Sequence, residues 1–98
     1  MATTVGKVGE IAPGNMANFQ VGGESIVVAN VEARLYAFND ICTHIGCSLY
    51  EGSLDGTTVI CPCHGSEFDV TTGTVMRGPA RDPIKTYAVQ IVGEELQI

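Results

Sequence analysis

The chain has 98 residues, of which 45% are apolar and 16% are charged, a balance that indicates one globular domain rather than a disordered segment. Its 11 acidic and 5 basic residues give a formal net charge of -6. This charge argues against binding to nucleic acid or to an anionic membrane, because both require a cationic surface. It favours a protein partner with a basic docking face.

The pattern along the chain predicts short β-strands separated by turns. Residues 5–11 alternate loosely, and the expected strands cover residues 17–21, 25–31, 34–39, 57–61 and 85–92, with a last short strand near Leu96. Gly22-Gly23 predicts a two-residue hairpin between the second and third of these strands. Further turns are expected at 13–15, 55–56, 72–73 and 78–79, and no segment has a sustained helical period. The sequence therefore predicts an all-β sandwich or barrel-like fold.

The start of the chain does not read as a secretory signal. Residues 1–8 have neither a cationic start nor a sustained apolar run, and no run in the chain approaches transmembrane length. We therefore expect a soluble, cytoplasmic protein with no membrane partner.

The largest irregular region, residues 42–70, contains every cysteine and histidine of the chain. A long loop region in a compact domain is usually functional. It holds two short motifs, C-T-H-I-G-C over residues 42–47 and C-P-C-H-G-S over residues 61–66. Cysteine thiolate and histidine imidazole are good ligands for soft and borderline metals. Each motif can therefore offer a sulfur and a nitrogen to one centre, Cys42 with His44 and Cys61 with His64.

Three other interpretations of these motifs compete. Covalent haem attachment needs Cys-x-x-Cys-His, and residues 61–64 are one residue short of it. A structural zinc module that mediates interactions would leave two of the six candidate ligands idle, and the spacing differs from the usual zinc fingers. A framework of disulfides alone leaves both histidines unexplained. The zinc module remains the alternative from a different functional class.

The two motifs together resemble the two-box signature of Rieske proteins. The resemblance implies a [2Fe–2S] cluster in which Cys42 and Cys61 hold one iron and His44 and His64 hold the other. E-G-S-L-D-G between the boxes and P-I-K-T-Y-A-V after them look like the small Rieske-type ferredoxins that serve bacterial oxygenases. The implied fold is a Rieske-like antiparallel β-sandwich or barrel. It would form a single domain over residues 1–98, with a small cluster-binding subdomain at about 41–81.

The histidine ligands have an electrostatic consequence. Two ferric ions, two sulfides, two thiolates and two neutral imidazoles sum to zero charge, whereas a cluster with four thiolates carries -2. Adding an electron to a neutral centre costs less than adding one to an anion. Rieske centres accordingly have potentials of roughly -150 to +300 mV, against about -400 mV for plant-type ferredoxins.

The resemblance also implies roles for residues around the ligands. Cys47 and Cys63 match cysteines that bridge the two cluster loops in one branch of the family. The alternative is two reduced, buried thiols, since intracellular disulfides are uncommon. Gly46 and Gly65 follow the ligand pairs, where glycine lets the backbone approach a cluster and point amide donors at its sulfurs.

Three further positions lie around the second box. Ser66 matches a serine whose hydroxyl donates to a cluster sulfide and raises the potential. Phe68 occupies the place where high-potential relatives carry a tyrosine that donates to a ligand sulfur, and phenylalanine lacks that donor. Pro79, within G-P-A, resembles the proline loop that covers the cluster.

The expected function is that of a soluble one-electron carrier, a component of an oxidoreductase system rather than an enzyme. It would accept electrons from a flavoprotein or other reductase and pass them to a terminal oxygenase or other redox acceptor, as a monomer. An oxygenase subunit would need another iron held by two histidines and a carboxylate. This chain has only two histidines, both already assigned, so no catalytic residue is expected. The alternative is the small subunit of a larger redox enzyme, similar to that of nitrite reductase.

Overall fold

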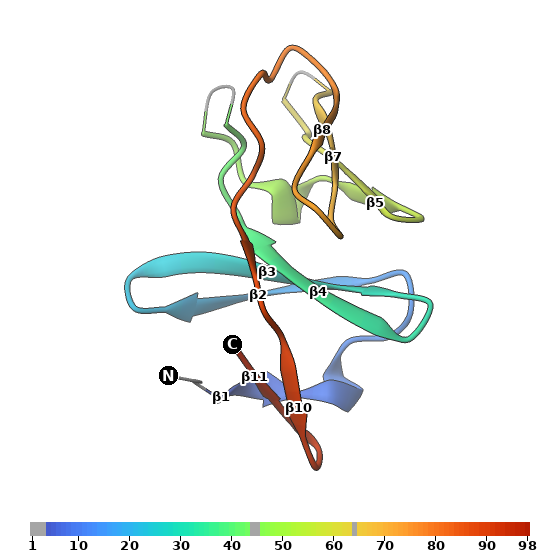
Figure 1. Ribbon diagram of the computed structural model, residues 1–98, viewed down its shortest axis with the longest axis vertical. Coiled ribbons are helices and arrows are strands. Elements are labelled where there is room, and N and C mark those ends of the chain that lie inside the picture. Colours follow the sequence, from blue (N-terminus) through green and yellow to red (C-terminus); the bar gives the residue numbers. More distant parts are fainter. Residues whose placement is uncertain (1–3, 44–45, 64) are drawn as a thin grey trace.

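The structure is a computed structural model, and it describes residues 4–43, 46–63 and 65–98. Three antiparallel sheets are stacked along the 39 Å long axis of the molecule (Figure 1). The predicted all-β class is confirmed: the described residues form no α-helix, only the two 3₁₀ turns η1 (Val8–Glu10) and η2 (Leu49–Glu51). No helix among them is long and apolar enough to cross a membrane.

The strands of each sheet are as follows. The lower sheet has the order β1 (Thr4–Lys7), β11 (Glu95–Gln97) and β10 (Gln90–Val92). The middle sheet has the order β2 (Met16–Val21), β3 (Glu24–Val31), β4 (Arg34–Asn39) and β9 (Thr86–Tyr87). The upper sheet has the order β5 (Ser53–Asp55), β6 (Thr58–Ile60), β7 (Glu67–Asp69) and β8 (Val75–Arg77). Strands β1 and β11 pair, so the lower sheet holds both ends of the described chain.

The predicted hairpin between β2 and β3 is confirmed. Val21 pairs with Glu24 across the two-residue loop Gly22-Gly23. Both glycines have positive φ, 58° and 84°, a conformation that glycine adopts without steric cost and that matches the twist of the flanking strands.

The middle sheet is buried on both faces, which explains the continuous apolar run of β3. Successive side chains of a strand point to opposite faces. Val27, Ala29 and Phe38 therefore join an upper core, and Ile26, Val28 and Ala37 join a lower one. The upper core also contains Cys42 and Cys61, so the middle sheet is the floor beneath both cysteine motifs.

The prediction of one strand over residues 85–92 is wrong. The segment divides into β9, which pairs with β4 in the middle sheet, and β10, which pairs with β11 in the lower sheet. Ala88 and Val89 between them belong to neither strand, because the chain changes pairing partners as it passes from one sheet to the other. Val89 packs against the lower core at this crossing.

The upper sheet was largely missed by the sequence analysis. Only β6 was expected there, whereas β5, β7 and β8 were not. Each of these strands has three residues, which is too short for an alternating pattern to stand out. The irregular region of residues 42–70 is thus partly built from paired strands.

Candidate metal centre

Two loops at the upper end of the molecule carry the cysteine motifs (Figure 1). The first loop, residues 42–47, lies between β4 and η2. Its ends are joined by the Cys42 amide, which donates to the carbonyl oxygen of Cys47 at 2.9 Å. Inside this ring the Gly46 amide donates to the carbonyl oxygen of Cys42, also at 2.9 Å.

The second loop, residues 61–66, lies between β6 and β7 and closes in the same way. The Cys61 amide donates to the carbonyl oxygen of Ser66 at 2.8 Å, and the Gly65 amide donates to that of Cys61 at 3.2 Å. The two loops therefore have the same backbone frame, which places Cys42 and Cys61 at equivalent positions. The sequence alone did not indicate this repeat.

The two loop glycines have the backbone conformation that a tight turn needs. Gly46 and Gly65 have φ values of 79° and 75°, in the left-handed region that favours glycine. Their amides donate to the carbonyl oxygens of Cys42 and Cys61. What the glycines supply is the turn that closes each loop.

A disulfide joins Cys47 of the first loop to Cys63 of the second, as the resemblance implies. Their Cα atoms lie 6.5 Å apart and 16 positions apart in the sequence. A bond closing a loop of this size contributes about 3 kcal/mol in the chain-entropy model. It also fixes the two loops against each other.

Cys42 and Cys61 lie outside this disulfide, and they are 1% and 2% exposed. The sulfur of Cys61 lies within 4.8 Å of the sulfurs of Cys47 and Cys63, so the disulfide is directly beside it. Because the disulfide sulfurs are bonded to each other, they do not serve as thiolate ligands. The donor set that remains, two buried thiols on equivalent loops, fits a centre held between the loops.

The predicted ligands His44 and His64 lie outside the described residues. Their assignment therefore stays a prediction. The described neighbour Thr43 is exposed, and Gly65 is half-buried.

The segment 78–84 is tied to both loops. The Ala80 amide donates to the hydroxyl oxygen of Ser66 at 3.0 Å, and the Thr43 hydroxyl donates to the carbonyl oxygen of Asp82 at 2.7 Å. Pro79, which follows a cis peptide bond, lines a hollow of about 420 Å³ together with Thr43, Arg81 and Asp82. The expected proline segment thus lies beside the first loop.

Ser66 and Phe68 are both fully buried below the second loop. Because the Ser66 oxygen accepts the Ala80 amide, its own proton is available for donation. Phe68 packs in the upper core with both ligand-candidate cysteines and pairs with Val59 on β6. Its ring offers no polar hydrogen.

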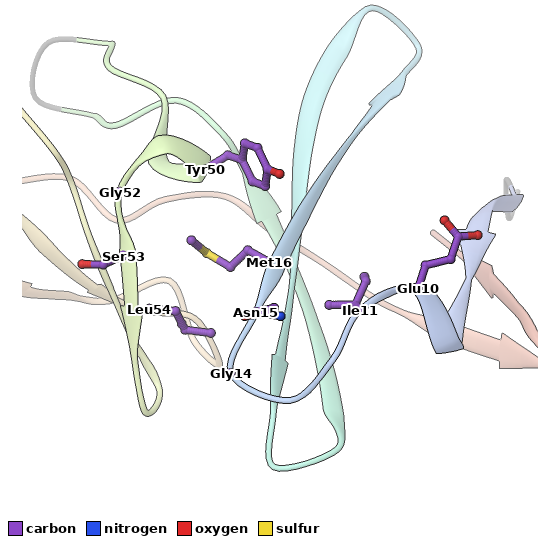
Figure 2. Close-up of a pocket in the computed structure, with 9 residues that line it drawn as sticks. All are labelled: Glu10, Ile11, Gly14, Asn15, Met16, Tyr50, Gly52, Ser53 and Leu54. Atoms are coloured by element: carbon purple, nitrogen blue, oxygen red, sulfur yellow. The ribbon is translucent and has the colours of Figure 1, made fainter.

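A second hollow, of about 490 Å³, lies on the side of the molecule between η2–β5 and the start of β2. Figure 2 shows Tyr50, Met16 and Leu54 extending into this space. Neither cysteine nor histidine is among its lining residues, so it offers no soft ligand for a metal.

Sequence reasoning did not single out two residues that hold the loops, Thr43 and Asp40. Thr43 lies inside the first box, where the only signal was a hydroxyl side chain between two ligand candidates. Asp40 is a buried acid two positions before Cys42. In the sequence Asp40 is an acidic residue at the end of a predicted strand, and such a residue is ordinarily expected to be exposed to solvent.

Comparisons with known proteins agree on one family. The model of the Rieske [2Fe-2S] domain matches residues 1–88. The ferredoxin component of biphenyl 2,3-dioxygenase from Rhodococcus jostii (strain RHA1) is 35% identical over 96 residues, which cover 98% of this chain and 90% of that protein.

Solved structures show the same likeness. A Sphingomonas yanoikuyae B1 ferredoxin superposes with a TM-score of 0.95 at 30% identity, covering 100% of this chain and 97% of the other. A chain in the complex of reduced oxygenase and oxidized ferredoxin in carbazole 1,9a-dioxygenase matches with a TM-score of 0.92 at 33% identity. That match covers 98% of this chain and 90% of the other. The fold predicted from the resemblance is thereby confirmed.

Proposed function

Because the chain belongs to the Rieske [2Fe–2S] domain family, we propose that it is a one-electron carrier that takes electrons from a reductase and delivers them to an oxygenase. One observation carries the proposal: two buried cysteines outside the disulfide, Cys42 and Cys61, lie on equivalent loops that the disulfide joins. The cluster supplies the electron transfer, and the protein supplies its binding, surroundings and docking surface.

The proposed ligands are Cys42 and Cys61 for one iron and His44 and His64 for the other. The burial of both thiols and the use of Cys47 and Cys63 in the disulfide support the cysteine pair. Cys42 and Cys61 occupy the same position in two loops that are closed by the same backbone hydrogen bonds, which supports a centre that both loops share.

Other residues of the chain act on the surroundings of this centre. We assign the Ser66 hydroxyl as a hydrogen-bond donor to the centre, since its oxygen already accepts the Ala80 amide. The segment around Pro79 excludes water from one side, because it is tied to both loops. Phe68 and the upper core exclude water from below.

We further propose that residues 1–98 form a single domain with a cluster-binding subdomain at about 41–81. The upper sheet and both loops fall within this range. The upper core, which packs against the middle sheet, connects the subdomain to the rest of the chain.

The partner classes follow from the relatives. One relative is the ferredoxin component of a dioxygenase, and a structural match comes from a complex of oxygenase and ferredoxin. The proposed acceptor is therefore a terminal oxygenase and the proposed donor a flavoprotein or other reductase, both in the cytoplasm. A net charge of -6 favours partners with basic docking faces.

The first test is the composition and spectrum of the purified protein. We expect two irons and two acid-labile sulfides per chain, a red-brown colour and, after reduction, an electron paramagnetic resonance (EPR) signal. Colourless protein containing one zinc would contradict the cluster and favour the structural module. Replacing His44 or His64 by cysteine tests the ligand assignment, because a retained cluster with a lower midpoint potential is expected.

The second test is electron delivery. A reductase and an oxygenase of the relatives' type are combined with and without this protein, and oxygenated product is measured. Turnover that depends on the protein is expected. If the reductase reduces the cluster but the oxygenase cannot reoxidise it, the proposed electron donor would stand and the proposed acceptor would be wrong.

A further inference from the structure

We propose that Asp40 is a positioning residue of the metal centre, whose buried carboxylate anchors both ends of the first loop to the middle sheet. The inference rests on the proposed function, because it concerns the loop that carries Cys42. It assigns Asp40 no contact with the cluster and no role as a ligand.

The carboxylate of Asp40 connects the sheet to the exit of the loop. Asp40 directly follows β4 and is 7% exposed. Its Oδ2 accepts the Ser25 hydroxyl at 2.9 Å, which is the link to β3. Its Oδ1 accepts the Ser48 hydroxyl at 2.9 Å and the Tyr50 amide at 2.8 Å, directly after the first loop.

The backbone of Asp40 repeats the same two connections. Its amide donates to the carbonyl oxygen of Ser25 at 3.0 Å, and its carbonyl oxygen accepts the Leu49 amide at 2.7 Å. Asp40 therefore fixes both ends of the first loop. It lies just before the loop in the chain, and its hydrogen bonds hold residues 48–50, just after the loop.

The first loop needs such an anchor more than the second. The second loop leaves β6 and enters β7, and these strands pair directly at its base, Ile60 with Glu67. The first loop leaves β4 in the middle sheet and enters η2, so no paired strands flank it; at its base lies only the isolated bridge between Ile41 and Ser48. The Asp40 carboxylate supplies the connection that a strand ladder supplies to the other loop.

The electrostatics of Asp40 strengthen this role. Within the described part of the chain the one ion pair is Arg77 with Glu67, so neutral hydroxyl and amide donors hold the Asp40 carboxylate. A buried charge that loses its donors is costly. Movement of the loop away from the sheet would remove the donors from Ser48 and Tyr50, so this cost opposes the movement.

Two serine variants separate positioning from general stabilisation. Both Ser48→Ala and Ser25→Ala remove a hydroxyl donor to the same carboxylate, but only Ser48 belongs to the loop side. Holoprotein is incubated with excess EDTA while the visible absorption is followed, and EPR spectra are recorded after reduction. We expect Ser48→Ala to lose its cluster about tenfold faster than wild type and to show broadened EPR lines. The effect of Ser25→Ala should be clearly smaller, because Asp40 stays attached to the middle sheet through β4 and through its amide bond to the Ser25 carbonyl oxygen.

Variants of Asp40 itself complete the series. Asp40→Asn keeps one acceptor oxygen for Tyr50 and Ser48, so it should lose the cluster more slowly than Asp40→Ala. The reverse order would overturn the proposal. If Asp40→Ala fails to fold, the two serine variants still decide.

The outcome also separates this proposal from the proposed function. Equal cluster loss and equal EPR broadening in Ser25→Ala and Ser48→Ala would overturn the role of Asp40 alone, as would a Ser48→Ala protein that matches wild type in both readouts. Reduction by a reductase is measured in the same samples. A wild type that holds a cluster but accepts no electrons overturns the carrier function instead.

Discussion

Ser66 combines two roles in one buried hydroxyl. Its oxygen accepts the Ala80 amide at 3.0 Å, and its proton remains for the proposed centre. A donor to a cluster sulfur stabilises the reduced state, which carries one more negative charge, more than the oxidised state. The donor role proposed for Ser66 would therefore raise the midpoint potential.

We predict that Ser66→Ala lowers the midpoint potential. If the hydrogen bond favours the reduced state by about 1.4 kcal/mol, the shift is about 59 mV for a one-electron couple. Protein film voltammetry measures it. Thr43→Val is the control, since it removes the other tether of the segment 78–84 and leaves the serine in place. Equal shifts in both variants would show that loosening of the segment, and not loss of a donor, sets the potential.

The opposite change is predicted for Phe68→Tyr. Phe68 is fully buried in the core that contains Cys42 and Cys61, so an added hydroxyl would lie in a dry environment where a donor is effective. By the family pattern the hydroxyl donates to a ligand sulfur. The midpoint potential should rise by an amount on the order of 60 mV, measured as for Ser66→Ala. A stable variant with an unchanged potential would show that the hydroxyl does not reach a ligand sulfur.

Among the elements, the connection from the upper sheet to β9 depends on one glycine. Gly73 has a φ of 82°, and a Cβ atom there would collide with the carbonyl oxygen of Ile84. The Gly73 carbonyl oxygen also accepts the Ile84 amide at 3.0 Å. This close approach holds the far end of the segment that carries Pro79 against the upper sheet.

We predict that Gly73→Ala destabilises the protein by more than about 2 kcal/mol, since it combines an unfavourable φ with a backbone clash. Gly56→Ala is the matched control: its φ is 59°, but the added Cβ atom meets nothing within 4 Å. About 1 kcal/mol is expected there. Urea unfolding followed by circular dichroism measures both free energies of unfolding. A similar loss in the two variants would mean that the contact at Ile84 relaxes without cost.

The charge of the whole molecule governs its encounters with partners. With a net charge of -6, association with a basic docking face is accelerated at low ionic strength. The Debye length falls from about 30 Å at 0.01 M salt to about 10 Å at 0.1 M. Long-range attraction should therefore weaken strongly over this range.

We predict that the second-order rate of reduction by the reductase falls as NaCl rises, which stopped-flow absorbance measures. Glu51→Gln and Glu94→Gln are matched variants, because each changes the net charge from -6 to -5 at an exposed position. Glu51 lies in η2, which follows the first loop along the chain, and Glu94 lies in the hairpin between β10 and β11. Glu51→Gln should slow reduction more. A rate independent of salt would exclude electrostatic steering.

The two cysteine motifs are sufficient to predict the family and the kind of metal centre from the sequence. Residue types and their spacing in two boxes are enough to indicate ligand chemistry, since each box places a sulfur and a nitrogen donor close together along the chain. The alternation in 34–39 and the Gly22-Gly23 turn likewise determined local strands and a hairpin, because both depend on neighbouring residues.

The hydrogen bonds that hold the two motifs in place are visible only in the tertiary structure. The closure of both loops by the same backbone hydrogen bonds is visible only in the folded chain. The split of 85–92 into two strands depends on partners in two different sheets. The donors to the buried Asp40 carboxylate, Ser25 and Ser48, are 15 and 8 positions away in the sequence and meet it only in the fold. Such long-range pairings leave no period in the sequence, which is why the hydrogen bonds that support the two loops were not predicted, although the Cys47–Cys63 disulfide was expected.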